Sequence, residues 1–89
     1  MIITLVLPRS LHKSVGNNLK IDACKMSELL KFISENLPSL KEEILENDSA
    51  FKRNILIIFN GNLVSKKDLS DIAFTENSTL EIMFQFAGG

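Results

Sequence analysis

Both ends of this chain carry the sequence pattern of a β-strand, and that feature constrains its fold most. Residues 2–7 form an apolar run rich in Ile, Leu and Val, which are residue types that favour strands. Near the other end, residues 80–86 alternate between two sets of side chains; one set is Leu80, Ile82, Phe84 and Phe86, and the other is Glu81, Met83 and Gln85. Both segments are long and apolar, so we expect them to be central and adjacent in one sheet.

The segment after the first strand is expected to complete a hairpin and then enter a helix. Alternation over residues 19–24 predicts a half-buried second strand, joined to the first by a longish loop over residues 8–16. Ser27 is placed to cap a helix, with apolar side chains recurring at helical spacing behind it. Pro38 ends or interrupts that helix, because proline cannot donate the backbone hydrogen bond that a helix interior needs.

The second half of the chain predicts a short helix and then two more strands before the last one. Residues 40–46 continue an apolar stripe, which suggests a short helix or turn. Residues 55–59 are continuously apolar and predict a buried central strand. Asn-Gly at residues 60–61 is the strongest hairpin signal in the chain, and residues 63–64 would form the short return strand.

Strands grouped around one main helix predict an α+β fold, with a mixed sheet packed against that helix. The order and the adjacent end strands indicate the β-grasp arrangement of ubiquitin-like proteins, although other small α+β folds fit the same pattern. The 89 residues are enough for one domain. We therefore expect a β-grasp domain over residues 1–86, followed by a flexible tail at residues 87–89.

Charge and composition exclude several classes of function. Ten basic and eleven acidic residues give a net charge of −1, so we expect no nucleic-acid binding through phosphates. The apolar start is short and meets Pro8 at once, so it predicts neither a signal peptide nor a membrane span. A single cysteine and a single histidine predict no internal disulfide and no metal site. We expect a cytoplasmic protein.

Catalytic motifs are sparse. The glycines form no phosphate-binding loop, and no serine lies in a nucleophile elbow. Cys24 and His12 are formally able to pair as nucleophile and base, but a lone cysteine is more often a small packing residue and a loop histidine is more often solvated. The basic pairs at residues 52–53 and 66–67 are interpreted as ordinary surface. We therefore expect a protein that is not itself an enzyme.

The segment Ala87-Gly88-Gly89 is the most informative short motif. Glycine has no side chain, so such a tail can extend and enter a narrow channel. No Cβ shields the terminal carbonyl carbon of Gly89 from attack. The carboxylate is a poor electrophile, so it needs activation, for example as an acyl-adenylate, before a sulfur or amine nucleophile can react there.

The chain resembles the MoaD/ThiS sulfur carriers, which are ubiquitin-like β-grasp proteins. The resemblance covers nearly the whole sequence and rests on four segments: Leu7-Pro8-Arg9-Ser10-Leu11 leading to Val15-Gly16, Met26-Ser27-Glu28-Leu29-Leu30, the hairpin Ile57-Ile58-Phe59-Asn60-Gly61-Asn62-Leu63-Val64, and the closing stretch from Thr75 to Ile82 followed by Phe86-Ala87-Gly88-Gly89. The final Gly-Gly together with the hairpin is the specific part.

This resemblance implies a mechanism and partners. A ubiquitin-activating-like adenylyltransferase would adenylate Gly89 with ATP, and a desulfurase or rhodanese would supply the sulfur for a thiocarboxylate. The large subunit of a sulfur-using synthase would then take that sulfur. Chain length favours molybdopterin synthesis over thiazole synthesis; cysteine synthesis and tRNA thiolation are alternatives. The chain would be a co-substrate or non-catalytic small subunit, with ATP used by its partner and no cofactor bound. A protein modifier joined through Gly89 and a non-covalent binding domain remain open.

Partner-binding residues are expected around the end of the last strand. If Leu80, Ile82 and Phe84 face the helix, Met83 and Gln85 face outward. An exposed methionine beside Phe86 suits an interface, because its side chain adapts to different surfaces. The expected partner-binding set is Met83, Gln85, Phe86, Ala87 and Gly88, extended by Phe59 and Leu63 near the hairpin.

Overall fold

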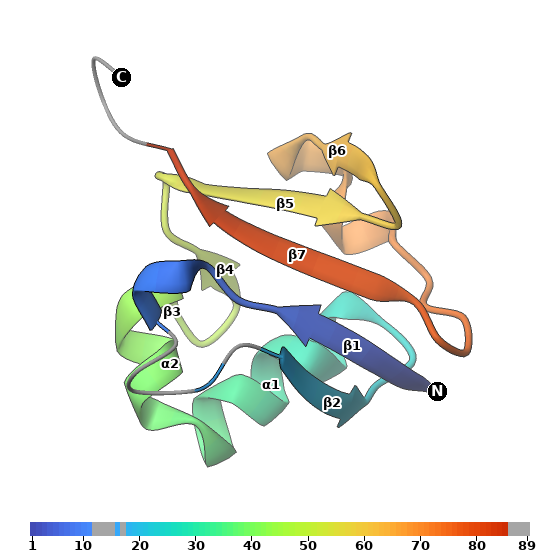
Figure 1. The fold of residues 1–89 in the computed structure, drawn as a ribbon, viewed down its shortest axis with the longest axis horizontal. Coiled ribbons are helices and arrows are strands. Elements are labelled where there is room, and N and C mark those ends of the chain that lie inside the picture. The colour runs from blue at the N-terminus through green and yellow to red at the C-terminus, as the bar shows by residue number, and fades with distance from the viewer. Residues whose placement is uncertain (12–15, 17, 86–89) are drawn as a thin grey trace.

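The computed structural model describes residues 1–11, 16 and 18–85, and these residues form a mixed sheet of five strands in the order β2-β1-β7-β5-β6 (Figure 1). The strands are β1 (Ile2–Val6), β2 (Asn18–Asp22), β5 (Ile55–Phe59), β6 (Asn62–Val64) and β7 (Thr79–Phe84). β1 runs antiparallel to β2 and parallel to β7, which confirms that the first and last strands are adjacent. The expected β-grasp fold is therefore confirmed.

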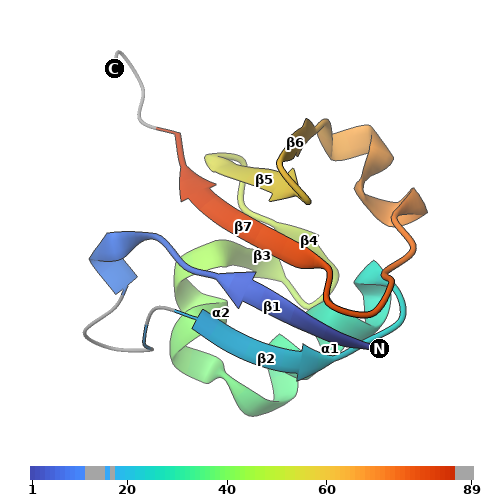
Figure 2. The ribbon, with the colours of Figure 1, turned by 45° about the vertical axis from the view of Figure 1, so that its right-hand side comes forward.

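The helices lie together on one side of this sheet, and Figure 2 shows them behind β1 and β2. The remaining elements are α1 (Met26–Asn36), α2 (Pro38–Ile44), the 3-10 segments η1 (Arg9–Leu11) and η2 (Lys66–Asp71), and a separate two-stranded sheet of β3 (Leu45–Asn47) and β4 (Ala50–Phe51). The helical stripe of α1 buries Leu29 and Ile33 completely. Leu80 and Ile82 of β7 are equally buried from the sheet side, so the core lies between α1 and the sheet.

The beginning of β7 is fixed by side-chain hydrogen bonds. Ser78 is 2% exposed, and its Oγ accepts a bond of 3.0 Å from the backbone N–H of Thr75. The Ser78 carbonyl accepts from the N–H of Thr4, at 2.8 Å. Asn60 continues the ladder beyond β5, since its Oδ1 accepts from the N–H of Thr79 at 2.8 Å and its own N–H donates to the Thr79 carbonyl. Both sides of the turn before β7 are therefore tied to the sheet.

The predicted Asn-Gly hairpin is confirmed. Asn60 has φ +49° and Gly61 has φ +87°, so both central residues of the turn are in the left-handed region that a type I′ turn needs. The turn sets the register between β5 and β6, in which Phe59 pairs with Asn62 and Ile58 pairs with Leu63.

The helix starts earlier than predicted, and Ser27 is not its cap. Lys25 occupies the N-cap position with an extended backbone, and no side chain caps the helix there. The chain is held just before this point because the N–H of Phe74 donates to the Cys24 carbonyl at 3.0 Å. Glu28 reaches back to accept from the N–H of Cys24 at 2.6 Å. Tertiary pairing thus decides where the helix begins.

The second helix is shorter than the predicted 40–46 segment at its C-terminal end. It ends at Ile44, and Leu45 has the extended backbone of a strand. Leu45 pairs with Phe51, and the N–H of Lys52 donates to the Ile44 carbonyl at 2.8 Å. The small β3–β4 sheet was not predicted, because its pairing joins short segments without a period-two pattern.

The predicted central strand over residues 55–59 is next to the centre of the sheet, which β7 occupies. Only one face of β5 is fully buried: Ile55 and Ile57 face the core, whereas Leu56 and Ile58 are half-buried on the other face. The predicted buried strand is confirmed as an interior strand of the sheet, but it is fully buried on one face only. Its second apolar face belongs to the outer surface of the sheet.

Candidate partner-docking site at the end of β7

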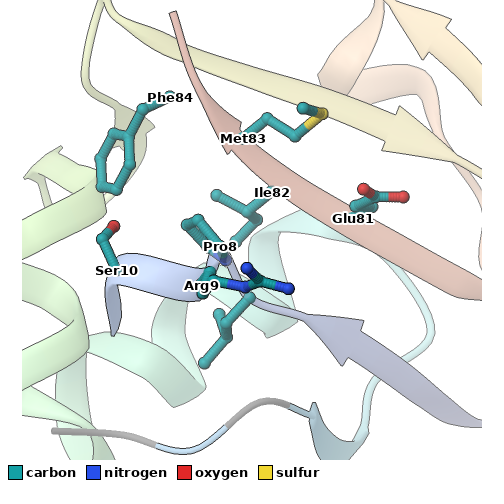
Figure 3. A pocket seen from close by; sticks show the side chains of 8 residues that line it. Pro8, Arg9, Ser10, Glu81, Ile82, Met83 and Phe84 are labelled. Atoms are coloured by element: carbon teal, nitrogen blue, oxygen red, sulfur yellow. The ribbon is translucent and has the colours of Figure 1, made fainter. Parts of the chain in front are cut away.

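A groove of about 410 Å³ lies where β7 ends, and it is the best candidate for a functional surface next to the tail sequence. Residues 7–10, which follow β1, form one side, and residues 81–84 of β7 form the other (Figure 3). Parallel pairing explains this arrangement: Val6 is in register with Glu81, so the chain leaving β1 runs beside the last half of β7.

The exit from β1 is built by local sequence. Pro8 follows the strand and cannot donate a ladder hydrogen bond. Its carbonyl accepts from the N–H of Leu11 at 2.9 Å, which closes the 3-10 turn η1. Leu11 is 5% exposed and anchors the turn in the core, so Arg9 and Ser10 are left at the surface beside the groove.

Two opposite charges line the groove without forming an ion pair. Figure 3 shows both side chains at the groove, Arg9 from η1 and Glu81 from β7. The ion pairs among the described residues join Met1 with Asp22 and Lys41 with Asp48, so both Arg9 and Glu81 stay available to a partner. Arg9 was not among the predicted partner-binding residues, although it lies in the Leu7–Leu11 segment that carries part of the family resemblance; Pro8 directly before it was the available signal.

The outer face of the sheet beside the groove carries exposed apolar side chains. Met83 is 41% exposed and is directly opposite Leu56 in the β5–β7 register. Leu63 is 67% exposed and is opposite Ile58 in the β5–β6 register. Cross-strand neighbours share a face, so these four residues form one surface, which we call the outer apolar strip. An exposed strip of this kind is typical of a protein-binding surface.

The predicted partner-binding residues are distributed as follows. Met83 and Leu63 lie in the outer apolar strip, and Gln85 is exposed at the end of β7, with its N–H donating to the Asn54 carbonyl at 2.7 Å. Phe59 is on the opposite face, where it packs on the core with its ring 5.8 Å from that of Phe74. The placement of Phe59 in the same patch as Met83 was therefore wrong. Phe86, Ala87, Gly88 and Gly89 lie outside the described residues.

The described part of the chain offers no second candidate site for catalysis or metal binding. Cys24 is a free, exposed thiol, and His12, its formally possible partner, lies outside the described residues. Within residues 1–11, 16 and 18–85, no three His, Cys, Asp or Glu side chains gather to hold a metal ion. In the same residues, no helix has the length and apolar character needed to cross a membrane.

The shifted titrations lie away from the groove. A hydrogen bond to Asp22 raises the pKa of the Met1 ammonium above its ordinary value of 8.0, and the Asp22 charge adds to this effect. A hydrogen bond from Lys41 lowers the pKa of Asp48 below its ordinary value of 3.8, with the Lys41 charge as the second cause. Both pairs join neighbouring elements of the fold, so they are structural contacts.

Solved structures that share this fold come from archaea and bacteria. Small archaeal modifier protein 1 from Methanosarcina acetivorans superimposes with a TM-score of 0.79 and 20% identity, over 99% of this chain and 96% of that one. The protein of the same name from Haloferax volcanii gives 0.77 and 17%, over 100% of both chains. A chain of the Amycolatopsis orientalis BexX/CysO complex gives 0.77 and 18%, over 98% of this chain and 99% of that one.

Sequence comparison adds no further relative. No protein-family model matches the chain. A search of curated proteins finds no match either. The structural likeness extends over nearly the whole chain but is low in identity, so it establishes the fold alone: this chain has the ubiquitin-like β-grasp fold.

Proposed function

We propose that this protein is a sulfur carrier that is activated at the Gly89 carboxylate. The observation that carries the proposal is the sequence Ala87-Gly88-Gly89, which follows β7 of a β-grasp body after two intervening residues. The similar structures support it, because they include proteins named as modifiers and a CysO protein in complex with BexX. In this view the chain is a carried co-substrate, and the enzymes are its partners.

The proposed reaction has two steps, and both take place on an activating enzyme of the adenylyltransferase class. The Gly89 carboxylate attacks the α-phosphate of ATP, and pyrophosphate leaves. In the second step, the persulfide of a desulfurase or rhodanese displaces AMP from the carbonyl carbon to give an acyl disulfide. A thiol then cleaves the S–S bond by exchange, which leaves the thiocarboxylate at Gly89 and a disulfide between the two thiols; free sulfide gives the thiocarboxylate directly. The reaction consumes ATP, so we assign it to the cytoplasm.

The β-grasp body contributes docking and not catalysis. The outer apolar strip offers Met83 and Leu63 for burial against a partner, while Arg9 and Glu81 offer charges of both signs at the groove beside it. Because strip and groove meet at the end of β7, a partner seated there holds the segment that leads to Gly89. Correct positioning of the carboxylate follows from that docking.

The sulfur acceptor we propose is the precursor of molybdopterin, with this chain as the small subunit of the synthase. Chain length is the feature that favours it over thiazole synthesis. Purified large subunit and the pterin precursor, mixed with thiocarboxylated chain, are expected to yield molybdopterin and regenerate the Gly89 carboxylate.

A second candidate function is covalent protein modification through Gly89. The name shared by two of the similar structures, small archaeal modifier protein 1, favours it. Both functions need the same activation of the Gly89 carboxylate, so they differ only in the molecule that finally reacts with the activated group or receives its sulfur. A modifier produces isopeptide-linked adducts of higher mass on lysines of other proteins, whereas a dedicated sulfur carrier does not.

Intact-mass measurement after incubation with ATP, a sulfide source and an adenylyltransferase that is active on a control carrier tests the proposal. We expect one oxygen of Gly89 to be replaced by sulfur, and loss of this product when Gly89 is deleted. Methionine oxidation adds nearly the same mass, so fragmentation has to locate the change on Gly89. An unchanged mass with an enzyme proven active would overturn the proposal.

Docking is tested separately with two matched variants. Met83→Glu and Ile2→Glu each place a carboxylate at a site that is 41% exposed, the first in the outer apolar strip and the second at the far end of β1. We expect Met83→Glu to reduce the rate of adenylation at least about tenfold, which is typical of an interface anchor, and Ile2→Glu to change it little. Equal effects of the two variants would show that the outer apolar strip does not contribute to docking.

A further inference from the structure

The hydrophobic core opens to solvent at one place on the helix side of the molecule. The three most exposed members of the core are Leu69, Phe51 and Leu30, at 8%, 7% and 6%. All three line a single pocket of about 320 Å³ between the start of α1, β4 and η2, together with Met26. The sheet separates this core pocket from the outer apolar strip, because its walls belong to the side on which α1 packs.

Two lysines are the charged residues that line the core pocket, and no carboxylate lines it. Lys25 is exposed at the N-cap of α1, with no hydrogen bond or ion pair from its side chain within the described residues. Lys66 is held at the rim because its Nζ donates to the carbonyls of Lys52 at 2.6 Å and Arg53 at 3.2 Å.

Two acidic side chains of the flanking segments, Glu28 of α1 and Asp68 of η2, are hydrogen-bonded to groups outside the pocket lining, and Asp71 at the end of η2 is exposed. Glu28 accepts from the N–H of Cys24 at 2.6 Å. Asp68 accepts from the Ser65 hydroxyl at 2.9 Å. Among the residues that line the core pocket, both charged side chains are therefore positive and stand beside apolar walls, although the whole chain has a net charge of −1.

The geometry points to a second docking site here, which binds an acidic peptide segment of a partner protein by inserting one apolar side chain. The apolar walls fit the anchor, and Lys25 and Lys66 fit carboxylates on either side of it. The volume is at the low end of ligand sites, which suits one side chain with its flanking backbone. Because the site is on the opposite side of the sheet, its partner and the activating enzyme can bind at the same time.

Peptide selection tests this proposal with the full chain. A phage-displayed library of random peptides is selected on immobilised protein, and the enriched peptide is synthesised and titrated into ¹⁵N-labelled protein. We expect enriched sequences to carry one Leu, Ile, Met or Phe flanked by Asp or Glu. The amide shifts are expected to centre on Leu30, Phe51 and Leu69, with a dissociation constant in the micromolar to millimolar range.

Charge variants separate specific binding from general attraction. Lys25→Glu is expected to weaken the peptide about tenfold or more, whereas Lys20→Glu, the same change on exposed β2, is expected to have little effect. Ala50→Phe is expected to block binding, because half-buried Ala50 lines the core pocket. Lys25→Glu adds a negative charge at a helix N-terminus, which is favourable, so loss of folding is not expected to explain its effect.

Four results would overturn the proposal. They are a selection without enrichment, enriched peptides that lack acidic residues, amide shifts centred on Met83 and Leu63, and equal effects of Lys25→Glu and Lys20→Glu. Decanoate provides a further control. If it displaces the enriched peptide and has the higher affinity of the two, the occupant is an acyl chain, and this result also contradicts a peptide site.

Discussion

The two ends of β7 are held in different ways. At its beginning, Ser78 is buried, and side-chain hydrogen bonds from Ser78 and Asn60 fix the turn and the first residue of the strand. At its end, Gln85 is exposed and is joined to Asn54 by one backbone hydrogen bond. The difference shows that hydrogen bonds to buried or turn side chains fix the register of the sheet at one end of the central strand, whereas the other end, for which we propose partner docking, is held by backbone pairing alone.

Truncation of a buried side chain near the fixed end is expected to have the largest effect on stability. Leu80 is fully buried, so Leu80→Ala should lower the free energy of unfolding by about 2–5 kcal/mol. Met83→Ala, near the open end, should change it by about 0.5 kcal/mol or less, as for most surface substitutions. Urea denaturation of both variants measures the difference. Equal losses would show that the two ends are not distinct.

Removal of the Ser78 hydroxyl is expected to have the next largest effect. Ser78→Ala removes a hydroxyl that is 2% exposed and that accepts from the N–H of the exposed Thr75, which should cost about 0.5–1.5 kcal/mol of unfolding free energy. Ser10→Ala, at the exposed groove by the open end, is the matched control and should be nearly neutral. Thermal denaturation of both variants measures the difference in stability. A neutral Ser78→Ala would show that the Ser78 hydroxyl does not stabilise this end of β7.

The smallest expected effect is a pH dependence at the fixed end, where Met1 and Asp22 pair at 2.8 Å. The folded-state pKa of the Met1 ammonium is raised above 8.0, so the stabilisation it gives is complete below pH 8.0 and is lost as the pH rises through the folded value. Hydrogen exchange of the Ala23 amide, which donates to the Met1 carbonyl, should accelerate beyond its ordinary base catalysis in that window.

The control for this titration is Asp22→Asn, which removes the carboxylate that raises the pKa. A Cys24→Ser background removes the neighbouring thiol from the measurement. The excess exchange should vanish in Asp22→Asn and persist in Cys24→Ser. The reverse pattern would assign the pH dependence to the thiol.

Local chemistry made much of the fold predictable. The Asn-Gly pair at residues 60–61 specifies its own turn type, because few other residues adopt positive φ twice in succession. The alternation in β7 is visible because only one face of the strand packs on α1, with Leu80 and Ile82 inward and Met83 outward. In these segments each signal lies within a few neighbouring residues.

The elements that were missed depend on contacts between distant residues. β4 exists because Phe51 pairs with Leu45, and the start of α1 depends on the bond from Phe74 to Cys24. The same holds for the site. The outer apolar strip was found in part through Met83 and Leu63, but the continuous run in β5 gave no indication of which residues point outward. Register with β7 and β6 supplies that information.

Parallel pairing of β1 with β7 has a practical consequence for attachment. The strands start at the same edge of the fold, so Met1 and Gln85 lie at opposite ends of the sheet. A strand of this length spans about 17–20 Å, which separates the two points by most of the width of the domain. A resin, label or fused protein joined at Met1 therefore leaves the approach to Gln85 sterically clear, whereas the same group joined after Gln85 occupies the approach itself.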